Sequence, residues 1–205
     1  MFISINPDNI NPKHIQEVVD ILNQDGIIIY PTDTVYALGC KLTSKKALSK
    51  LAQLKGIKLN KANFSLIFDS MSNLSEYVKQ FDRSIFKLLN KSLPGPFTFI
   101  LDANNSVPKL FDSNKKEVGI RIPNNAITLE IVKQLGVPLA STSVHDESDE
   151  IMEYYLDPNE IFVHYENLVD AIIDGGLGKL YGSTVVSCVG GEIEIIRQGL
   201  GKLDI

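Results

Sequence analysis

Four side chains suited to recognising a small polar molecule follow a short apolar stretch near the N-terminus: Thr32, Asp33, Thr34 and Tyr36. The preceding residues 26–29 are a glycine and three isoleucines, a pattern typical of a buried β-strand. Such a strand would bring two hydroxyls, a carboxylate and a phenol to one end of a sheet, where they could hold a ligand. The same residues are also consistent with a turn in which Thr and Asp cap the following backbone.

A second polar feature is an arginine inside another predicted strand. Arg121 lies among apolar residues in the stretch 118–122. Burying an unpaired guanidinium there would be costly, so Arg121 must meet an anionic partner or reach a cleft. A structural carboxylate and an anionic ligand are both open as that partner.

Hydroxyl and basic side chains lie beside three further predicted strands and near the C-terminal one. They are Thr98, which follows Pro94-Gly95-Pro96; Ser141, Ser143 and His145; Ser183 and Thr184; and Arg197. Each has a simpler explanation as a turn residue, a loop histidine or a surface arginine. Their joint occurrence with Thr34 and Arg121 predicts a polar cleft that suits carboxylate and phosphate oxygens.

The elements that must position these residues alternate between strands and helices. Asn11-Pro12 predicts a capped helix start, and Gly39 is expected to allow a tight turn after the first polar motif. Strands are expected at 2–5, 26–29, 64–68, 97–101, 118–122, 138–141, 184–188 and 192–197, and helices over 12–25, 45–54, 81–89 and 127–135. This interleaving predicts an α/β domain with a mixed sheet, and the acidic segment 146–160 is expected to be a mobile loop.

Charge is distributed unevenly although the net charge is only −5. Residues 41–61 contain seven lysines and no Asp or Glu, whereas residues 146–160 contain seven acidic residues and no Lys or Arg. A lysine-only segment repels itself unless it meets a polyanion, a phosphate or the acidic segment across the fold. The lysines inside the predicted helix are equally consistent with a solvated face. Lys55, Lys58 and Lys61 lie past that helix, which favours phosphate contact.

Composition narrows the class of protein. The chain has 205 residues and is 44% hydrophobic, which is enough for one full core, and we expect a single domain over 1–205. No apolar run approaches the ~20 residues that a membrane span requires, and the N-terminus has no signal-peptide pattern. Two cysteines, Cys40 and Cys188, are too few for a disulfide framework or a zinc site. We therefore expect a cytoplasmic protein without a bound metal of its own, in which both cysteines are small core or turn residues.

These motifs, taken in order, resemble the YrdC-like family. The matching stretches are 31–39 (PTDTVYALG), 94–98 (PGPFT), 119–123 (GIRIP), 141–143 (STS) and 183–186 (STVV). They extend over about residues 10–200. The first motif is specific, and the others gain weight from their order and spacing. The resemblance implies a twisted mixed α/β sheet flanked by helices, with a large concave, locally basic cleft.

The best-known members of that family are L-threonylcarbamoyladenylate synthases. They combine L-threonine, bicarbonate and ATP into threonylcarbamoyl-AMP and pyrophosphate, for the modification of adenosine 37 in tRNA, and Mg²⁺ would assist the departing pyrophosphate. Double-stranded RNA binding is also attributed to the family. The resemblance implies a threonine site and a nucleotide site. The threonine site would contain Thr34, Arg121, Ser141 and Ser183; the nucleotide site would contain Lys55, Lys58, Thr98, Ser143, His145 and Arg197.

The chain departs from the synthase pattern at three places. The Lys-x-Arg motif reads Lys55-Gly56-Ile57, and the rival alignment at Lys58 also lacks an arginine. The Ser-x-Asn motif has His145 in place of asparagine. A histidine expected after the strand at Leu66 is interpreted as replaced by Asp69, whose charge would alter the substrate's surroundings. These changes are similar to those of a YciO-like branch.

Three functional hypotheses follow. The chain is a nucleotidyltransferase that makes threonylcarbamoyl-AMP, or it is a binding module for RNA or tRNA that uses the lysine segment 41–61 without this synthesis. A third possibility is a protein that acts on a preformed acyl-adenylate with His145 as the general base.

Overall fold

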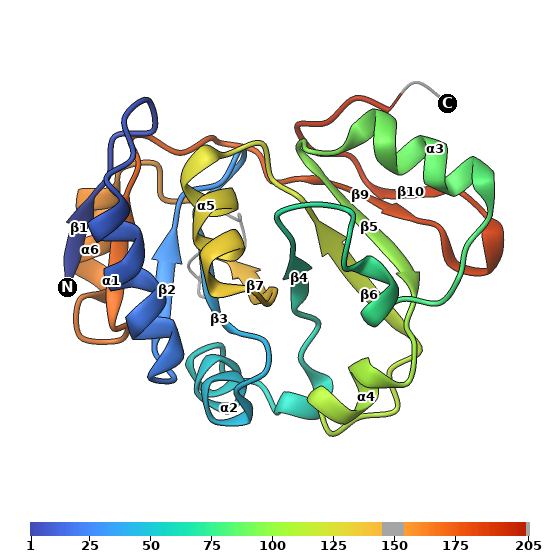
Figure 1. Ribbon diagram of the computed structural model, residues 1–205, viewed down its shortest axis with the longest axis horizontal. Helices are drawn as coiled ribbons and strands as arrows, with labels where there is room; N and C mark the ends of the chain where they lie inside the picture. The colour runs from blue at the N-terminus through green and yellow to red at the C-terminus, as the bar shows by residue number, and fades with distance from the viewer. Residues whose placement is uncertain (145–153, 204–205) are drawn as a thin grey trace.

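The computed structural model describes residues 1–144 and 154–203 and contains one ten-stranded mixed sheet. Its strands lie in the order β1-β8-β2-β3-β7-β4-β6-β5-β9-β10. The sheet twists strongly from the β1 edge to the β10 edge, with helices on its faces (Figure 1). The predicted twisted, mixed α/β sheet is confirmed.

The strands are β1 (Phe2–Ser4), β2 (Ile27–Tyr30), β3 (Ala37–Lys41), β4 (Ser65–Ile67), β5 (Phe97–Asp102), β6 (Glu117–Arg121), β7 (Leu139–Ser143), β8 (Ala171–Asp174), β9 (Thr184–Ser187) and β10 (Glu194–Arg197). The helices are α1 (Pro12–Asn23), α2 (Lys45–Leu54), α3 (Arg83–Ser92), α4 (Ser106–Leu110), α5 (Ala126–Leu135) and α6 (Pro158–Tyr165), with short 3-10 turns η1 (Leu59–Lys61), η2 (Leu74–Glu76) and η3 (Val189–Gly191). No helix in the described ranges is long and apolar enough to cross a bilayer.

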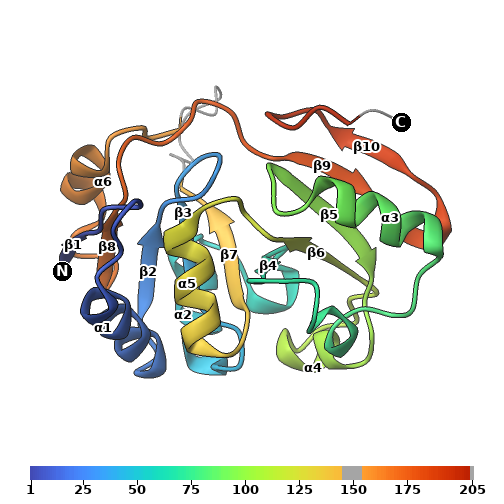
Figure 2. The ribbon, with the colours of Figure 1, turned by 45° about the horizontal axis from the view of Figure 1, so that its top comes forward.

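Helix α1 begins as its sequence predicts. The Asn11 side chain accepts a hydrogen bond from the Lys13 amide, and Pro12 occupies the first turn, where its missing N–H leaves no bond unmade. Helix α1 packs against α5, and their apolar faces bury one side of β1, β8 and β2. Figure 2 shows α1 beside β2 and α5 in front of β3 and β7.

Strand β2 is buried on both faces. Ile28 and Tyr30 join the core beneath α1 and α5, while Ile27 and Ile29 join the core that contains the apolar face of α2. Burial on both faces explains why the run of isoleucines shows no alternation with polar residues. Because β2 ends at Tyr30, the polar residues that follow begin at that end of the strand.

Two sequence-based expectations are wrong. Gly39 lies in the middle of β3 and not in a turn; a Cβ atom there would stand 2.7 Å from Cε1 of Tyr30, so glycine makes room for that ring. The acidic segment does not remain a loop throughout, because Asp157 caps α6 and residues 158–160 form its first turn. The part of that segment in 145–153 lies outside the described residues.

The second half of the sheet carries the polar segments. Strands β4 and β6 run parallel, β6 and β5 antiparallel, and β5 and β9 parallel, while β7 pairs with β4. Helix α3 covers β5, β9 and β10 (Figure 2). The register therefore places residues from distant parts of the sequence in adjacent rows.

Candidate functional site

A cavity of about 410 Å³ opens on a face of the sheet and is lined by alternate residues of neighbouring strands. Because successive side chains on a strand point to opposite faces, a two-residue step keeps one set in the cavity. The pairs that face it are Ser65 and Ile67 on β4, Thr98 and Ile100 on β5, Gly119 and Arg121 on β6, Ser141 and Ser143 on β7, and Ser183 and Val185 at β9. Its volume suits a small-molecule ligand.

Arg121 lines one end of this cavity and is 8% exposed. Its Nη2 donates to Asp33 Oδ1 at 3.0 Å and to Thr34 Oγ1 at 3.1 Å. Among the described residues, its Nε has no hydrogen-bond partner although it is buried. A buried donor without an acceptor costs about 1–3 kcal/mol, so Arg121 keeps unused hydrogen-bonding capacity beside the cavity. Arg121 thus has a structural carboxylate partner and also reaches a cleft.

Thr34 supports Arg121 from the protein side. It is fully buried and does not line the cavity. The Thr32 hydroxyl donates to the Val35 carbonyl at 2.7 Å, so the Thr34 hydroxyl donates to Thr32 and accepts from Arg121. This chain of hydrogen bonds and the Asp33 carboxylate hold the guanidinium in one orientation.

Three hydroxyl residues on the wall of the cavity, Ser141, Ser183 and Thr98, are hydrogen-bonded in pairs, Ser141 to Tyr30 behind the wall and Ser183 to Thr98. Ser141 Oγ donates to the Leu38 carbonyl at 3.0 Å, so the Tyr30 hydroxyl, 2.6 Å away, donates to Ser141. Burial raises the pKa of Tyr30 to about 12, which keeps this donor protonated at neutral pH. Ser183 and Thr98 share a hydrogen bond of 2.7 Å. In this arrangement Ser141 retains a lone pair that can accept from a ligand.

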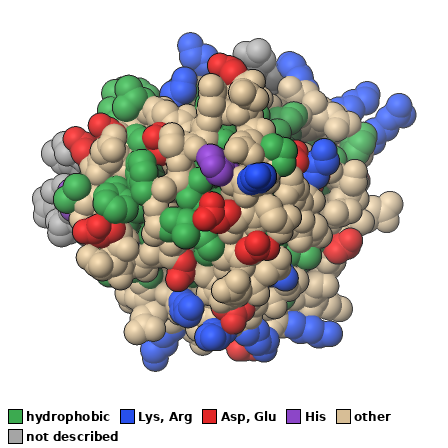
Figure 3. Space-filling view, turned by 60° about the vertical axis from the view of Figure 1, so that its left-hand side comes forward, with side chains coloured by type: hydrophobic (Ala, Val, Ile, Leu, Met, Phe, Trp, Pro, Cys, Tyr) green, Lys and Arg blue, Asp and Glu red, His purple; other side chains and the backbone are tan. Residues whose placement is uncertain are grey.

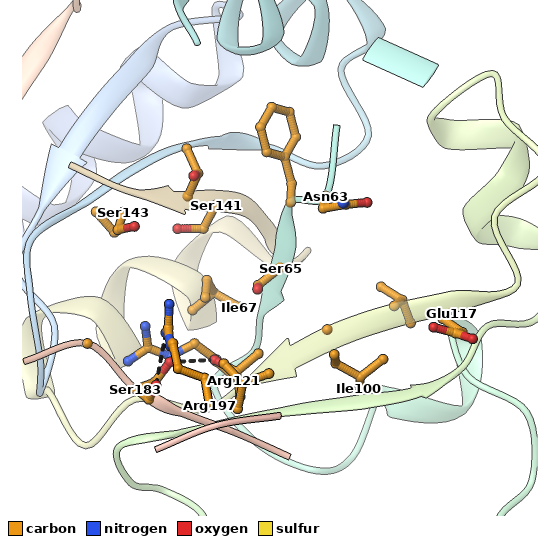
Figure 4. Close-up of a pocket in the computed structure, with 18 of the residues that line it drawn as sticks. Asn63, Ser65, Ile67, Ile100, Glu117, Arg121, Ser141, Ser143, Ser183 and Arg197 are labelled. Atoms are coloured by element: carbon orange, nitrogen blue, oxygen red, sulfur yellow. Dashed lines mark hydrogen bonds between the residues drawn. The ribbon is translucent and has the colours of Figure 1, made fainter. Parts of the chain in front are cut away.

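Arg197 lies beside Arg121 and Ser183 at one end of the cavity (Figure 4). Its Nη2 donates to the Ser183 carbonyl at 2.9 Å. Because Asp33 neutralises Arg121, this end keeps one positive charge in excess, which suits a monoanionic group.

The predicted site residues therefore divide into three groups. Thr98, Arg121, Ser141, Ser143, Ser183 and Arg197 line one cavity, and Thr34 contacts Arg121. Lys55 and Lys58 do not line it: Lys55 is 8% exposed at the end of α2, and Lys58 is exposed before η1. His145 lies outside the described residues. Asp69 does not line this cavity; it lines a different, smaller one with Lys133, and its effect on the substrate's surroundings stays a prediction.

Sequence reasoning missed the far side of the cavity. Asn63, Ser65, Lys115 and Glu117 line it, and Figure 4 places Asn63 and Glu117 away from the two arginines. Ser65 carried a usable signal, since it is the polar residue next to buried Leu66 on a strand whose other face is core. Lys115 gave no such signal in the sequence, because it lies in the segment between α4 and β6 and follows no strand or helix pattern.

The lysine segment 41–61 is partly engaged within the fold. Lys41 donates to Asn23, Lys45 pairs with Asp112 at 3.0 Å, and Lys46 lies 3.6 Å from Asp25. Lys and Arg side chains gather toward the bottom of Figure 3, with acidic side chains among them. The charge of this segment is therefore locally offset by scattered carboxylates.

The two cysteines have the environment of core residues. Both are buried, and burial raises the pKa of Cys40 to about 12 and that of Cys188 to about 11. A thiol with such a pKa is neutral at pH 7 and a poor nucleophile.

The described residues contain no group of three or more His, Cys, Asp or Glu side chains that could hold a metal ion. Glu117 is the one carboxylate among the described residues that line the cavity. Mg²⁺ commonly binds through substrate phosphates and one or two carboxylates, and this donor set fits a cation carried in by a nucleotide.

Comparison with known proteins gives consistent results. A family model named for Sua5, YciO and YrdC, and described as "Telomere recombination", matches residues 20–199. The "Uncharacterized protein YciO" of Escherichia coli K12 is 35% identical over 203 residues, 98% of this chain and 97% of the relative. A protein of Haemophilus influenzae is 35% identical over 202 residues, 98% of this chain and 96% of its own length.

Two solved structures share the fold. The crystal structure of E. coli YciO superimposes with a TM-score of 0.88 at 34% identity and covers 98% of this chain and 97% of its own. Sua5 of P. abyssi, solved in complex with L-threonine, gives 0.85 at 22% identity, over 97% of this chain and 57% of its own. The family resemblance and its YciO-like branch are thus confirmed: the chain belongs to the Sua5/YciO/YrdC family.

Proposed function

We propose that the protein is a nucleotidyltransferase that combines L-threonine, bicarbonate and ATP into threonylcarbamoyl-AMP, with release of pyrophosphate and water. The observation that carries this proposal is the arrangement of Arg121. Its Nη2 is fixed by Asp33 and Thr34, while its buried Nε has no acceptor among the described residues. A fixed guanidinium with a spare donor on a cavity wall suits a carboxylate.

The surrounding groups match the rest of a hydroxy amino acid. The Ser141 oxygen has a free lone pair for an ammonium N–H, since its own proton is used on Leu38. The pair formed by Thr98 and Ser183 offers hydroxyls for the side chain. The L-threonine in the P. abyssi Sua5 structure supports this class of ligand.

The nucleotide would occupy the remaining cavity, with Arg197 and Ser143 as the predicted contacts. The chain's own contribution is to hold the amino acid and the phosphates in line and to stabilise charge. Mg²⁺ bound to the triphosphate would neutralise the departing pyrophosphate.

The direct test is pyrophosphate release. Protein incubated with ATP, Mg²⁺ and bicarbonate is expected to release pyrophosphate only when L-threonine is present, with L-valine as the control amino acid that lacks the hydroxyl. Release that does not depend on threonine, at high protein concentration, contradicts the proposal.

RNA binding at residues 41–61 has weaker support from the structure. Several of these lysines already contact Asp25, Asp112 or Asn23, and Lys55 and Lys58 lie outside the cavity. The hypothesis of a preformed acyl-adenylate rests on His145, which lies outside the described residues.

A further inference from the structure

The cavity has a basic residue on its far side that the family resemblance does not assign. Lys115 lies in the segment between α4 and β6, is half-buried and lines the cavity. Its Nζ donates to the Ala62 carbonyl and, at 2.8 Å, to Asn63 Oδ1, and it lies 5.3 Å from the centroid of the Phe111 ring. These contacts place the ammonium next to Asn63, away from the two arginines.

All the partners of Lys115 in the described residues are neutral: two carbonyl oxygens and an aromatic face. Lys45, Lys46 and Lys133, by contrast, each face a carboxylate. Burial lowers the pKa of Lys115, since the charged form has lost part of its hydration without gaining a counter-charge. An ammonium in this state gains more from an arriving anion than an exposed lysine does.

Lys115 also adds a positive charge to a cavity that lacks the arginine of the synthase pattern. Ile57 stands where the synthase pattern expects an arginine; it is exposed and does not line the cavity. Lys55 and Lys58 do not line it either. Among the described residues of the cavity, positive charge comes from Arg121, Arg197 and Lys115, and negative charge from Glu117 alone.

We propose that Lys115 is an anion-binding residue that holds a phosphate group of the ligand at the end of the cavity opposite Arg121 and Arg197. This inference rests on the proposed function for its ligand class. It separates the two anionic groups: the amino-acid carboxylate lies at Arg121, and a phosphate lies at Lys115. Asn63 and Phe111 then act as positioning residues for the ammonium.

The test compares ligands with and without phosphate. Dissociation constants for ATP, inorganic pyrophosphate and adenosine are measured by calorimetry for wild type and for Lys115→Gln. The matched control is Lys116→Gln, an exposed neighbour that does not line the cavity. Loss of a charge-assisted hydrogen bond is expected to raise Kd for ATP and pyrophosphate at least 10-fold, with adenosine unchanged within 2-fold. Lys115→Arg is expected to retain phosphate binding, and Lys116→Gln to match wild type.

A purely structural role of Lys115 would give a different result. If Lys115 only ties residues 62–63 to the segment beside it, Lys115→Gln weakens adenosine and ATP equally or leaves both unchanged, and the inference fails. Should Lys115→Gln not fold, the pKa of Lys115 in wild type is followed by NMR. A rise on addition of pyrophosphate, with Lys116 unmoved, supports the inference; no rise overturns it.

Failure of the inference and failure of the proposed function give different results. Threonine-dependent pyrophosphate release that is unchanged in Lys115→Gln, with the same KM for ATP, removes the role of Lys115 and keeps the synthase. Pyrophosphate binding that depends on Lys115 without any threonine-dependent release keeps the role of Lys115 and removes the synthase. A wild-type protein that binds neither ATP nor pyrophosphate overturns the inference.

Discussion

Arg121 shows how one side chain serves both structure and recognition. The sequence posed a choice between a structural carboxylate and a ligand, and the structure shows that the carboxylate uses only part of the guanidinium. Since the side chains of Arg121 and Asp33 are 10% and 9% exposed, removing either partner would leave a buried charge. A test of the recognition role must therefore keep the charge and change the shape.

Arg121→Lys makes that change. Lysine retains a cation for Asp33 but lacks the planar group that presents a second donor. We expect Kd for L-threonine to rise about 10-fold or more, measured by calorimetry. Arg83→Lys, at an exposed position on α3, is the matched control and is expected to leave Kd unchanged. Equal affinity in wild type and Arg121→Lys would show that the ligand does not use the guanidinium.

Tyr30 gives a prediction for alkaline pH. Burial raises its pKa from 10.0 to about 12, so the folded state keeps the phenol proton where the unfolded state has lost it. Its contribution to stability is fully present below pH 10 and is lost as the pH rises through 12. The loss is on the order of 2–3 kcal/mol.

Urea denaturation at pH 9.5, 10.5 and 11.5 measures this effect. Tyr30→Phe is expected to be less stable at pH 9.5, because it loses the hydrogen bond to Ser141, but to lose less stability between pH 10 and 12. Burial also raises the pKa of Tyr36 to about 12. Because Tyr36 is present in both proteins, the stability of each still falls somewhat as the pH rises from 10 to 12. Parallel pH curves for wild type and Tyr30→Phe would contradict the assignment.

At the scale of elements, the strands and helices with strong patterns were predictable. Apolar runs and the Asn11-Pro12 cap located β2 and α1 to within a residue or two, because local sequence determines them. Strand β3 was missed, since its residues Ala37–Lys41 include Gly39, which reads as a turn until the Tyr30 ring is placed beside it. Predicting β3 would have required knowledge of this tertiary contact, which local propensity does not provide.

The segment around α2 gives a prediction for RNA. Lys45 and Lys46 face Asp112 and Asp25, whereas Lys58 and Lys61 are exposed around η1. If duplex RNA binds here, the double variant Lys58→Ala/Lys61→Ala should lose more affinity than Lys45→Ala/Lys46→Ala. For the Lys58→Ala/Lys61→Ala variant, the slope of log K against log salt concentration should become smaller in magnitude by roughly 2, measured by filter binding between 50 and 200 mM salt. Equal losses, or none, would exclude η1 as the contact.

At the scale of the whole molecule, the site exists because distant segments share a register. Ile67 pairs with Arg121, Ser65 with Ser141, and Ile100 with Gly119. The sequence predicted that the arginine and the hydroxyls would converge, since each lies at or beside a strand. It could not predict Lys115 or Asn63, because their positions depend on how two loops pack after the sheet has formed.

Gly119 sets the depth of the cavity floor. A Cβ atom there would lie 3.1 Å from Ser65 Oγ and 3.3 Å from Thr98 Cγ2, with no positive φ to strain. Gly119→Ala is expected to weaken threonine binding slightly and Gly119→Val to abolish it, because the branched side chain fills the floor. Thermal melting of Gly119→Ala should change by only a few degrees, since Ser65 and Thr98 need to move by only a few tenths of an ångström. Retained binding in a folded Gly119→Val protein would place the ligand elsewhere.

The two-residue alternation along β4, β5, β6 and β7 has a practical consequence for engineering. Leu66, Phe99, Ile120 and Ala140 stand between the cavity-facing positions and belong to the core. A combinatorial library restricted to every other codon of these strands would vary the pocket chemistry while leaving the opposite face intact. Arg121 should be kept in such a library, because its loss would leave the Asp33 carboxylate buried without its partner.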